Sequence, residues 1–253
     1  MPRTTEVVSL SAVRLHVNVD HVATLRNARG TTYPSPLRAA EDCLTAGADG
    51  ITAHLREDRR HIVDDDVTAL RALCRRAART FNLEMAATDE MVGIATRARP
   101  DVCTLVPERR EERTTEGGLD VVGGGAQLAQ RIRALVDAGI KVSLFIAADP
   151  GQIEASRSAG AVQIELHTGE YAHGREGELA RLAAGATRAH GLALEVAAGH
   201  GLTQDNVPAL MGIHEIVELN IGHALVGDAV FVGMGAAVRE YRAAIDRGVA
   251  LRA

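Results

Sequence analysis

The most constraining feature of this 253-residue sequence is a regular alternation of short aliphatic runs with amphipathic stretches. In two of those stretches, Asp64–Arg79 and Gly177–His190, apolar residues gather on one face at helical spacing. Alternating strands and helices favour βα units and a parallel sheet. The expected strands are Leu15–Val19, Gly50–His54, Asn82–Met85, Asp101–Leu105, Lys141–Ile146, Ala161–Leu166, Ala193–Ala197 and Glu215–Asn220. Eight such units in succession predict an α/β fold of the closed (β/α)8 type, a TIM barrel.

The junctions between helices and strands support one continuous barrel. Around residues 46–51, 138–142 and 159–162, an Ala-Gly pair stands between a helical stretch and an aliphatic run. Glycine at that point provides the left-handed residue that ends a helix. No Pro-rich or Gly/Ser-rich linker divides the chain, and barrels of this type commonly occupy about 250 residues. We therefore expect one barrel domain over residues 15–253, preceded by an N-terminal extension of residues 1–14.

Composition excludes several classes of partner. The sequence has no Trp, three Phe and three Tyr, so few rings are available to stack on nucleic-acid bases. Its longest apolar stretch, Leu135–Ala148, contains two charged residues and is shorter than the ~20 residues of a membrane helix. The three cysteines have no CxxC spacing, which favours a reducing cytoplasm. We expect a cytoplasmic protein that binds neither nucleic acid nor membrane.

Lysine is almost absent. Lys141 is the only lysine among the 28 basic residues, so the other 27 are arginines. Only lysine can form an imine with a carbonyl substrate. Lys141 begins its predicted strand, which places it at the end of the barrel opposite the usual catalytic face. An enzyme-bound imine of the aldolase type is therefore not expected.

Ionisable residues gather where six of the eight predicted strands end. In a (β/α)8 barrel these carboxyl ends form the rim on which ligand sites are built. A single His or Glu there is more often a hydrogen-bonded structural residue, and Asp20 has a further interpretation as a helix cap. Convergence on one rim favours a site. The residues concerned include Asn18, Asp20, His21, His54, Arg56, His61, Glu84, Glu165, His167, His200, Asn220 and His223.

Two groups of residues suit phosphate. Gly199-His200-Gly201 and Gly222-His223 follow the seventh and eighth strands, where this fold commonly cradles phosphate, although Gly-His-Gly is also an ordinary turn. Several arginines follow the first two strands and offer bidentate anion binding, although each alone is more often a solvated surface residue. These arginines are Arg26, Arg29, Arg56, Arg59 and Arg60. Two anion sites on one rim would suit two phosphorylated substrates.

Other chemistries lack a motif. There is no HExxH pair or cysteine ligand set, so no metal is expected, although several His and Glu could still converge on one in space. Gly123-Gly124-Gly125 does not follow a strand as a dinucleotide fingerprint requires, and no cofactor is expected. Acid–base chemistry by His and Glu on phosphorylated carbonyl compounds remains.

The sequence resembles the pyridoxine 5′-phosphate synthase family, and the resemblance runs in order from about residue 15 to residue 230. It is carried by residues 18–30, 54–61, 82–86, 105–108, 114–120, 165–169, 198–202 and 218–224. The resemblance implies a TIM barrel with additional helices, assembled as a homo-octamer. It also implies condensation of 3-amino-2-oxopropyl phosphate with 1-deoxy-D-xylulose 5-phosphate to pyridoxine 5′-phosphate, phosphate and water, without a metal.

The same resemblance implies roles for individual residues. His54 and Glu84 would accept protons, His200 would donate one, and Glu165 would stabilise developing charge. The aminoketone phosphate would be held by Asn18, Arg29, Gly201, Gly222 and His223, and the deoxyxylulose phosphate by Asp20, His21, Arg56, His61 and Thr114. Segment 107–119 is expected to close over the intermediates and exclude water.

The chain departs from the family pattern at two positions, and two other functions remain open. Ala197 and Ala147 stand where the family often has Asn and Asp, which removes hydrogen-bonding groups near two strand ends. One alternative function is another sugar-phosphate isomerase or aldolase on the same barrel. The other is a non-catalytic phosphate-binding protein, which would have no use for a carboxylate at Glu84.

Overall fold

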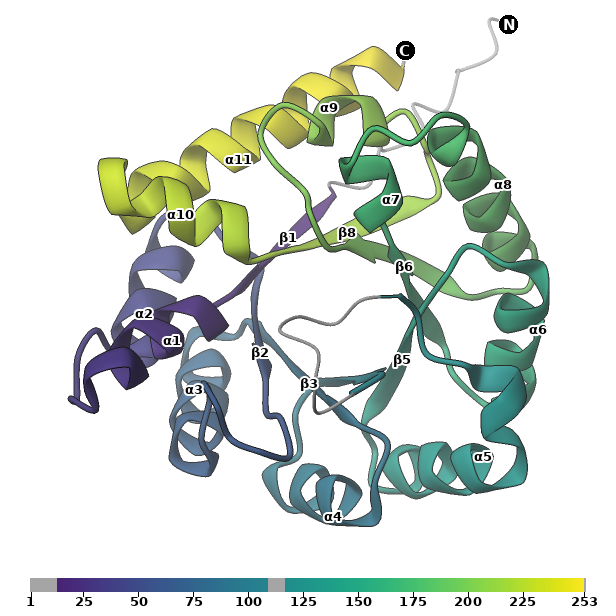
Figure 1. Cartoon of the computed structure of the whole chain (residues 1–253), viewed down its shortest axis with the longest axis horizontal. Helices are drawn as coiled ribbons and strands as arrows, with labels where there is room; N and C mark the ends of the chain where they lie inside the picture. The colour runs from purple at the N-terminus through teal and green to yellow at the C-terminus, as the bar shows by residue number, and fades with distance from the viewer. Residues whose placement is uncertain (1–12, 109–116, 253) are drawn as a thin grey trace, which may run out of the picture.

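The eight predicted strands form a closed parallel barrel in the computed structural model, which describes residues 13–108 and 117–252. Figure 1 looks into the ring of strands, with the helices arranged around it. Each strand is hydrogen-bonded to its neighbours in the sequence, and β1 closes the ring against β8. The strands are β1 (Arg14–Asn18), β2 (Gly50–His54), β3 (Thr80–Ala86), β4 (Val102–Val106), β5 (Lys141–Ile146), β6 (Gln163–His167), β7 (Glu195–Gly199) and β8 (Ile216–Ile221).

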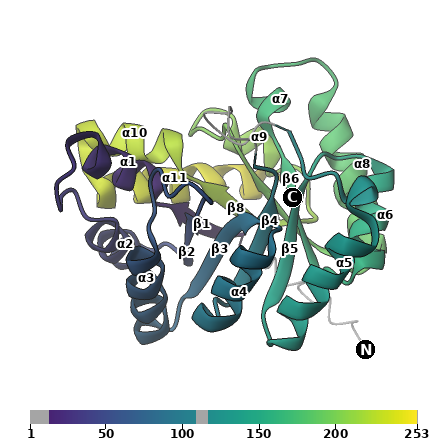
Figure 2. The same cartoon turned by 60° about the horizontal axis from the view of Figure 1, so that its bottom comes forward.

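The predicted TIM barrel with additional helices is confirmed. Two helices separate β1 from β2, a short helix precedes α8, and two helices follow β8. In Figure 2, helices α3, α4 and α5, which cover one side of the barrel, come to the front. The helices are α1 (Asp20–Arg29), α2 (Pro36–Thr45), α3 (Asp64–Ala77), α4 (Asp89–Ala98), α5 (Val121–Asp137), α6 (Pro150–Ala159), α7 (Gly169–Ala172), α8 (Glu178–Gly191), α9 (Val207–Leu210), α10 (His223–Val232) and α11 (Met234–Val249), followed by a 3-10 turn, Ala250–Arg252. No helix in the described ranges is long and apolar enough to cross a bilayer.

Helix ends follow the expected local chemistry. Gly47, Gly139 and Gly160 have φ values of 107°, 78° and 100° and lead from a helix into the following strand, as predicted. Strand β7 begins at Glu195, two residues later than predicted, because Ala193 lies in the turn that ends α8. Ala193 has a φ of 56°, and its N–H donates to the His190 carbonyl.

Alternate residues of the strands form two different environments. One set is aliphatic or aromatic, is fully buried and packs with the helices, as Leu15, Ile51 and Phe81 do. The other set is polar, and its members hydrogen-bond to one another from strand to strand across the barrel. The aliphatic core therefore lies between strands and helices, whereas much of the space inside the ring is lined by polar groups.

Lys141 lies at the amino end of the barrel, as predicted. It is the first residue of β5, and its Nζ lies 2.9 Å from a carboxylate oxygen of Glu195, the first residue of β7. Arg14, at the start of β1, pairs with Glu195 and with the buried Glu218 of β8. The only lysine thus belongs to an ion-pair network at the end opposite the predicted catalytic rim.

Candidate active site

A cavity of about 490 Å³ opens at the carboxyl ends of the strands. It brings together twelve of the fourteen predicted site residues, as expected for side chains at the ends of parallel strands. These are Asn18, Asp20, His21, His54, Arg56, His61, Glu84, Glu165, His200, Gly201, Gly222 and His223. Thr114 lies outside the described residues, and Arg29 is exposed at the end of α1 and is not part of the cavity lining.

Asp20 ties the first two strands together. Its Oδ1 accepts the backbone N–H of His54 at 2.8 Å, and its Oδ2 accepts from Asn18 Nδ2 at 2.9 Å. Asp20 is the first residue of α1, whereas the N-cap position is occupied by Val19, and no side chain caps this helix. The interpretation of Asp20 as a helix cap is therefore wrong, because its carboxylate is used to fix the end of β2 instead.

Glu84 and His54 stand side by side on paired strands. They are register partners in the β2–β3 pair, with the His54 side chain buried and the Glu84 side chain half-buried where it lines the cavity. Burial raises the pKa of Glu84 to about 7, with the charge of Asp20 adding to the effect and that of His54 opposing it. Burial lowers the pKa of His54, but the Glu108 hydrogen bond and the charges of Glu84 and Asp20 outweigh it, so the net pKa is raised. Near neutral pH both groups can therefore exchange protons.

Glu165 lies deeper in the barrel and is held by Asn220, whose Nδ2 donates to Oε2 at 2.8 Å. Burial, followed by the charges of Glu84 and Glu218, raises the Glu165 pKa well above its ordinary value. Gly199 lies against the same carboxylate, because a Cβ at that position would fall 2.1 Å from Oε1. The side chain can thus supply either a proton or a negative charge, depending on its neighbours.

His200 has a strained backbone. Its φ is 86°, in the left-handed region that non-glycine residues rarely adopt. The Thr168 hydroxyl contacts the carbonyl oxygens of Gly199 and His200, at 2.7 and 2.6 Å. The His167 ring lies behind His200, with ring centroids 4.9 Å apart, and its pKa is lowered to about 4, mainly by burial. His167 is therefore neutral near pH 7, and His200 is the member of this pair that lines the cavity.

The loops after β7 and β8 bring backbone close to the cavity, as a phosphate cradle requires. Gly201 has a φ of 73°, and a Cβ there would fall 2.6 Å from the Ala172 methyl group. Gly222 precedes the first turn of α10, and a Cβ there would crowd the Asn18 side chain at 3.0 Å. Backbone N–H groups at the start of a helix favour anions. The geometry therefore fits the predicted cradle.

The five predicted anion-binding arginines have different surroundings. Arg56 and Arg60 line the cavity. Arg26 makes a bidentate pair with Asp66 at 2.7 and 2.8 Å, and Arg59 pairs with Asp64 and Glu90 at 3.2 and 2.8 Å. The ion pairs of Arg26 and Arg59 fix the loop after β2 and its surroundings. Arg56 and Arg60 each also pair with Asp58 while lining the cavity.

Sequence reasoning assigned no role to two residues that contact predicted catalytic groups. Asn220 holds Glu165, and Glu108 lies 2.8 Å from Nε2 of His54. Each residue stands at or just after the end of a strand, β8 and β4 respectively. Their position on the rim was therefore a usable signal, but the partner of each side chain depends on contacts across the barrel.

One group of described residues has the geometry to hold a metal ion. Asp20, His54 and His61 each offer one ligand atom, and these atoms lie within 4.8 Å of one another. Histidine nitrogen and carboxylate oxygen suit zinc and related ions. In this arrangement, however, both Asp20 oxygens already accept hydrogen bonds, and His54 already contacts Glu108. A metal at this position would have to displace these hydrogen bonds.

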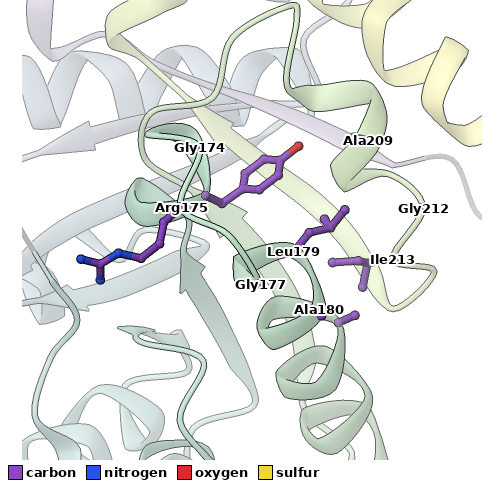
Figure 3. Close-up of a pocket in the computed structure, with 10 residues that line it drawn as sticks. Gly174, Arg175, Gly177, Leu179, Ala180, Ala209, Gly212 and Ile213 are labelled. Atoms are coloured by element: carbon purple, nitrogen blue, oxygen red, sulfur yellow. The ribbon is translucent and has the colours of Figure 1, made fainter.

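A second cavity, of about 720 Å³, lies outside the barrel between α7, α8 and α9 (Figure 3). Its lining is mainly aliphatic, and its one charged side chain, Arg175, pairs with Glu170 at 2.9 Å. The described lining offers no acid–base pair. The cavity at the strand ends, by contrast, is lined by several His and Glu side chains.

Fold and site together define a (β/α)8-barrel protein of the enzyme class, with histidine, glutamate and glycine residues gathered on one rim. The family model described as "Pyridoxal phosphate biosynthesis protein PdxJ" matches residues 15–247. The chain belongs to this family.

Proteins named pyridoxine 5′-phosphate synthase are similar to the chain over almost its whole length. The protein of Xanthobacter autotrophicus is 58% identical over 247 residues, covering 94% of this chain and 95% of its own. That of Caulobacter sp. strain K31 is 57% identical over 242 residues, covering 92% and 96%. Among solved structures, thiamine phosphate pyrophosphorylase from Pyrococcus furiosus has a TM-score of 0.65 at 14% identity, covering 95% of this chain and 98% of its own. That likeness concerns the barrel fold alone.

Proposed function

We propose that this enzyme condenses 3-amino-2-oxopropyl phosphate with 1-deoxy-D-xylulose 5-phosphate to give pyridoxine 5′-phosphate, phosphate and water. The observation that best supports this is the placement of His54 beside Glu84, whose pKa is raised to about 7. Two such groups can move protons in either direction near neutral pH. The names of the relatives agree with this reaction.

The reaction needs an amine, and the substrate brings its own. The amine of 3-amino-2-oxopropyl phosphate adds to the ketone of the second substrate, and loss of water gives an imine. No enzyme lysine is required, in accord with the position of Lys141 at the far end of the barrel. Phosphate then leaves by cleavage of its carbon–oxygen bond, a carbon–carbon bond closes the ring, and a second water is lost; each of these steps removes or delivers a proton.

Each proton transfer has a candidate group on the rim. In the proposed mechanism His54 and Glu84 accept protons, and His200 donates one to a departing oxygen. Glu165, facing the cavity from deeper in the barrel, stabilises charge on the intermediates. The phosphates would be held by the two glycine-containing loops and by Arg56.

The direct test is an assay that supplies both substrates and measures their loss together with the fluorescence of pyridoxine phosphate. We expect loss of both substrates with formation of the fluorescent product. Turnover of deoxyxylulose phosphate without use of the aminoketone would instead indicate a sugar-phosphate isomerase or aldolase. Binding of both phosphates without any turnover would indicate a phosphate-binding protein.

A chelator tests the metal-free mechanism. If the acid–base groups suffice, turnover stays unchanged after treatment with EDTA and after removal of the chelator. Loss of turnover that a divalent ion restores would assign the Asp20, His54 and His61 group to a metal.

We further propose that the enzyme is a homo-octamer. Val230, Phe231 and Val232 at the end of α10 are 68%, 88% and 47% exposed, and Leu25 on the adjacent α1 is 51% exposed. A group of exposed apolar side chains is typical of a contact between subunits. Arg29 lies one turn beyond Leu25, so it would be close to such a contact. Light scattering of the wild type and of Phe231→Glu tests this: eight copies are expected for the wild type and a smaller particle for the variant.

A further inference from the structure

Glu108 connects the predicted base to two other parts of the rim. It lies two residues beyond β4, and its Oε1 is 2.8 Å from Nε2 of His54. Its Oε2 accepts the backbone N–H of Glu57, in the loop after β2, at 3.2 Å. The His54 and Glu108 side chains are each only 6% exposed. One carboxylate thus contacts the ring of the predicted base and the backbone beside it, out of contact with most solvent.

The charge state of Glu108 determines which nitrogen of His54 carries a proton. Burial would raise the pKa of Glu108, but the hydrogen bond and charge of His54, helped by the Glu57 N–H and by Arg56, lower it overall. Glu108 is therefore ionised near neutral pH and can only accept hydrogen bonds. The hydrogen atom between the two groups then belongs to Nε2, which leaves Nδ1 as the basic nitrogen of the neutral ring.

A second contact fixes the backbone of His54. The backbone N–H of His54 donates to Asp20 Oδ1 at 2.8 Å, so the residue is held at its backbone by a carboxylate on α1 and at its ring by one that follows β4. The titratable and charged groups around the ring come from several elements and comprise Asp20 on α1, Arg56 and His61 after β2, Glu84 on β3 and Glu108 after β4. Among these groups in the described ranges, Glu108 is the one whose carboxylate is hydrogen-bonded to the His54 ring.

We propose that Glu108 is a positioning residue for His54: it keeps the ring in the tautomer with hydrogen on Nε2 and presents Nδ1 as the base. A carboxylate paired with imidazole acts in this way in other acid–base sites, where it also stabilises the imidazolium that forms. When Nδ1 takes a proton, the bonding electron pair stays on the substrate and the new positive charge faces Glu108. This inference rests on the proposed function, in which His54 accepts a proton.

The first test measures the His54 ring directly. Protein labelled with ¹⁵N in its histidine rings is titrated by NMR as wild type and as Glu108→Gln, with His54→Asn used to assign the signal. We expect the Nε2–H tautomer in the wild type. Because a hydrogen bond to a charged group is lost, the His54 pKa is expected to fall by about one to two units in Glu108→Gln. An unchanged tautomer and pKa would overturn the proposal.

The second test measures turnover against pH. A base must be unprotonated, so the acidic limb of the kcat/KM profile is expected to move to lower pH in Glu108→Gln. The shift should match that of the His54 pKa, about one to two pH units. The maximal kcat falls by about 10²-fold because the base is weaker and less well oriented, whereas KM for both substrates changes little. A fall in kcat with an unmoved pH profile would mean that Glu108 only supports the loop, and would overturn the proposal.

Two further variants complete the design. Glu57→Gln is the matched control, because Glu57 is exposed and contributes its backbone N–H, not its side chain, to Glu108. It should leave the His54 pKa and the pH profile unchanged. Glu108→Asp keeps the charge and should give a smaller pKa shift than Gln, which keeps the question answerable if Glu108→Gln folds poorly. If the wild type forms no pyridoxine phosphate, the proposed function fails, whereas the NMR titration still decides whether Glu108 sets the tautomer of His54.

Discussion

Replacing Glu84 by Gln should stabilise the protein at alkaline pH while abolishing its turnover. The pKa of Glu84 is raised from 4.5 to about 7, chiefly by burial, so the folded protein resists ionising this group. In the unfolded chain the carboxyl ionises near its ordinary pKa. As pH rises from 4.5 towards 7, the unfolded state loses its proton first, and stability falls. Above pH 7 both states are ionised, and the loss of stability is constant.

The size of this effect follows from the pKa difference. A shift from 4.5 to about 7 is 2.5 units, and each unit corresponds to 1.36 kcal/mol, which gives about 3 kcal/mol at pH 8.5 and about 0.8 kcal/mol at pH 5. Glutamine does not ionise and has nearly the same shape. Glu84→Gln should therefore be more stable than the wild type by roughly these amounts, less the cost of burying an amide N–H₂ near Asn18.

The measurement is urea unfolding of the wild type and of Glu84→Gln at about pH 5 and about pH 8.5, at equal protein concentration, with turnover assayed in parallel. The difference in unfolding free energy should increase from the acidic to the alkaline condition by about 2 kcal/mol. A difference independent of pH would refute the argument that Glu84 is held protonated by burial. Near-normal turnover of Glu84→Gln would refute its role as a base.

Three further substitutions test other parts of the site. Lys141→Met should retain turnover, because the substrate supplies the amine. It should lower the free energy of unfolding by no more than about 1 kcal/mol, since the Lys141 ion pair is partly exposed. Loss of turnover in a folded variant would point to an enzyme imine. Thr168→Val removes the hydroxyl contacts to the carbonyl oxygens of Gly199 and His200. It should lower kcat and reduce the free energy of unfolding in urea by about 1–3 kcal/mol. Wild-type values for both would show that the Thr168 hydroxyl does not support the His200 turn. Gly199→Ala should displace the Glu165 carboxylate and reduce turnover at least tenfold, since a Cβ would fall 2.1 Å from it; an unaltered kcat would show that Glu165 can move without consequence.

Much of the fold was predictable because its signals are local. The strand Gly50–His54 and the strand Lys141–Ile146 have the predicted boundaries, since each is an aliphatic run bounded by polar or glycine residues. Errors occurred where helix-ending turns extend into a run, as at Ala193. The position of Lys141 at the amino end of the barrel also follows from order along the chain, because all strands of a parallel barrel point the same way.

The candidate site was predictable at the level of membership. Parallel strands bring all their carboxyl ends to one rim, so a polar residue at the end of a strand is placed there by topology alone. Glu84 and Glu165 were assigned to the site in this way, and both line the cavity. Arg29 remains a prediction, because within this chain it is exposed and does not line the described cavity.

The sequence by itself determined a parallel barrel and the residues that face its rim, because strand periodicity and βα alternation depend on neighbours a few residues apart. Only the tertiary structure decided which groups meet. His54 contacts Glu108, and Glu165 contacts Asn220, over separations of 54 and 55 residues. The raised pKa of Glu84 likewise requires burial that exists only once the ring has closed. Contacts across a barrel depend on how all eight strands are staggered, and no local pattern of residues encodes that stagger.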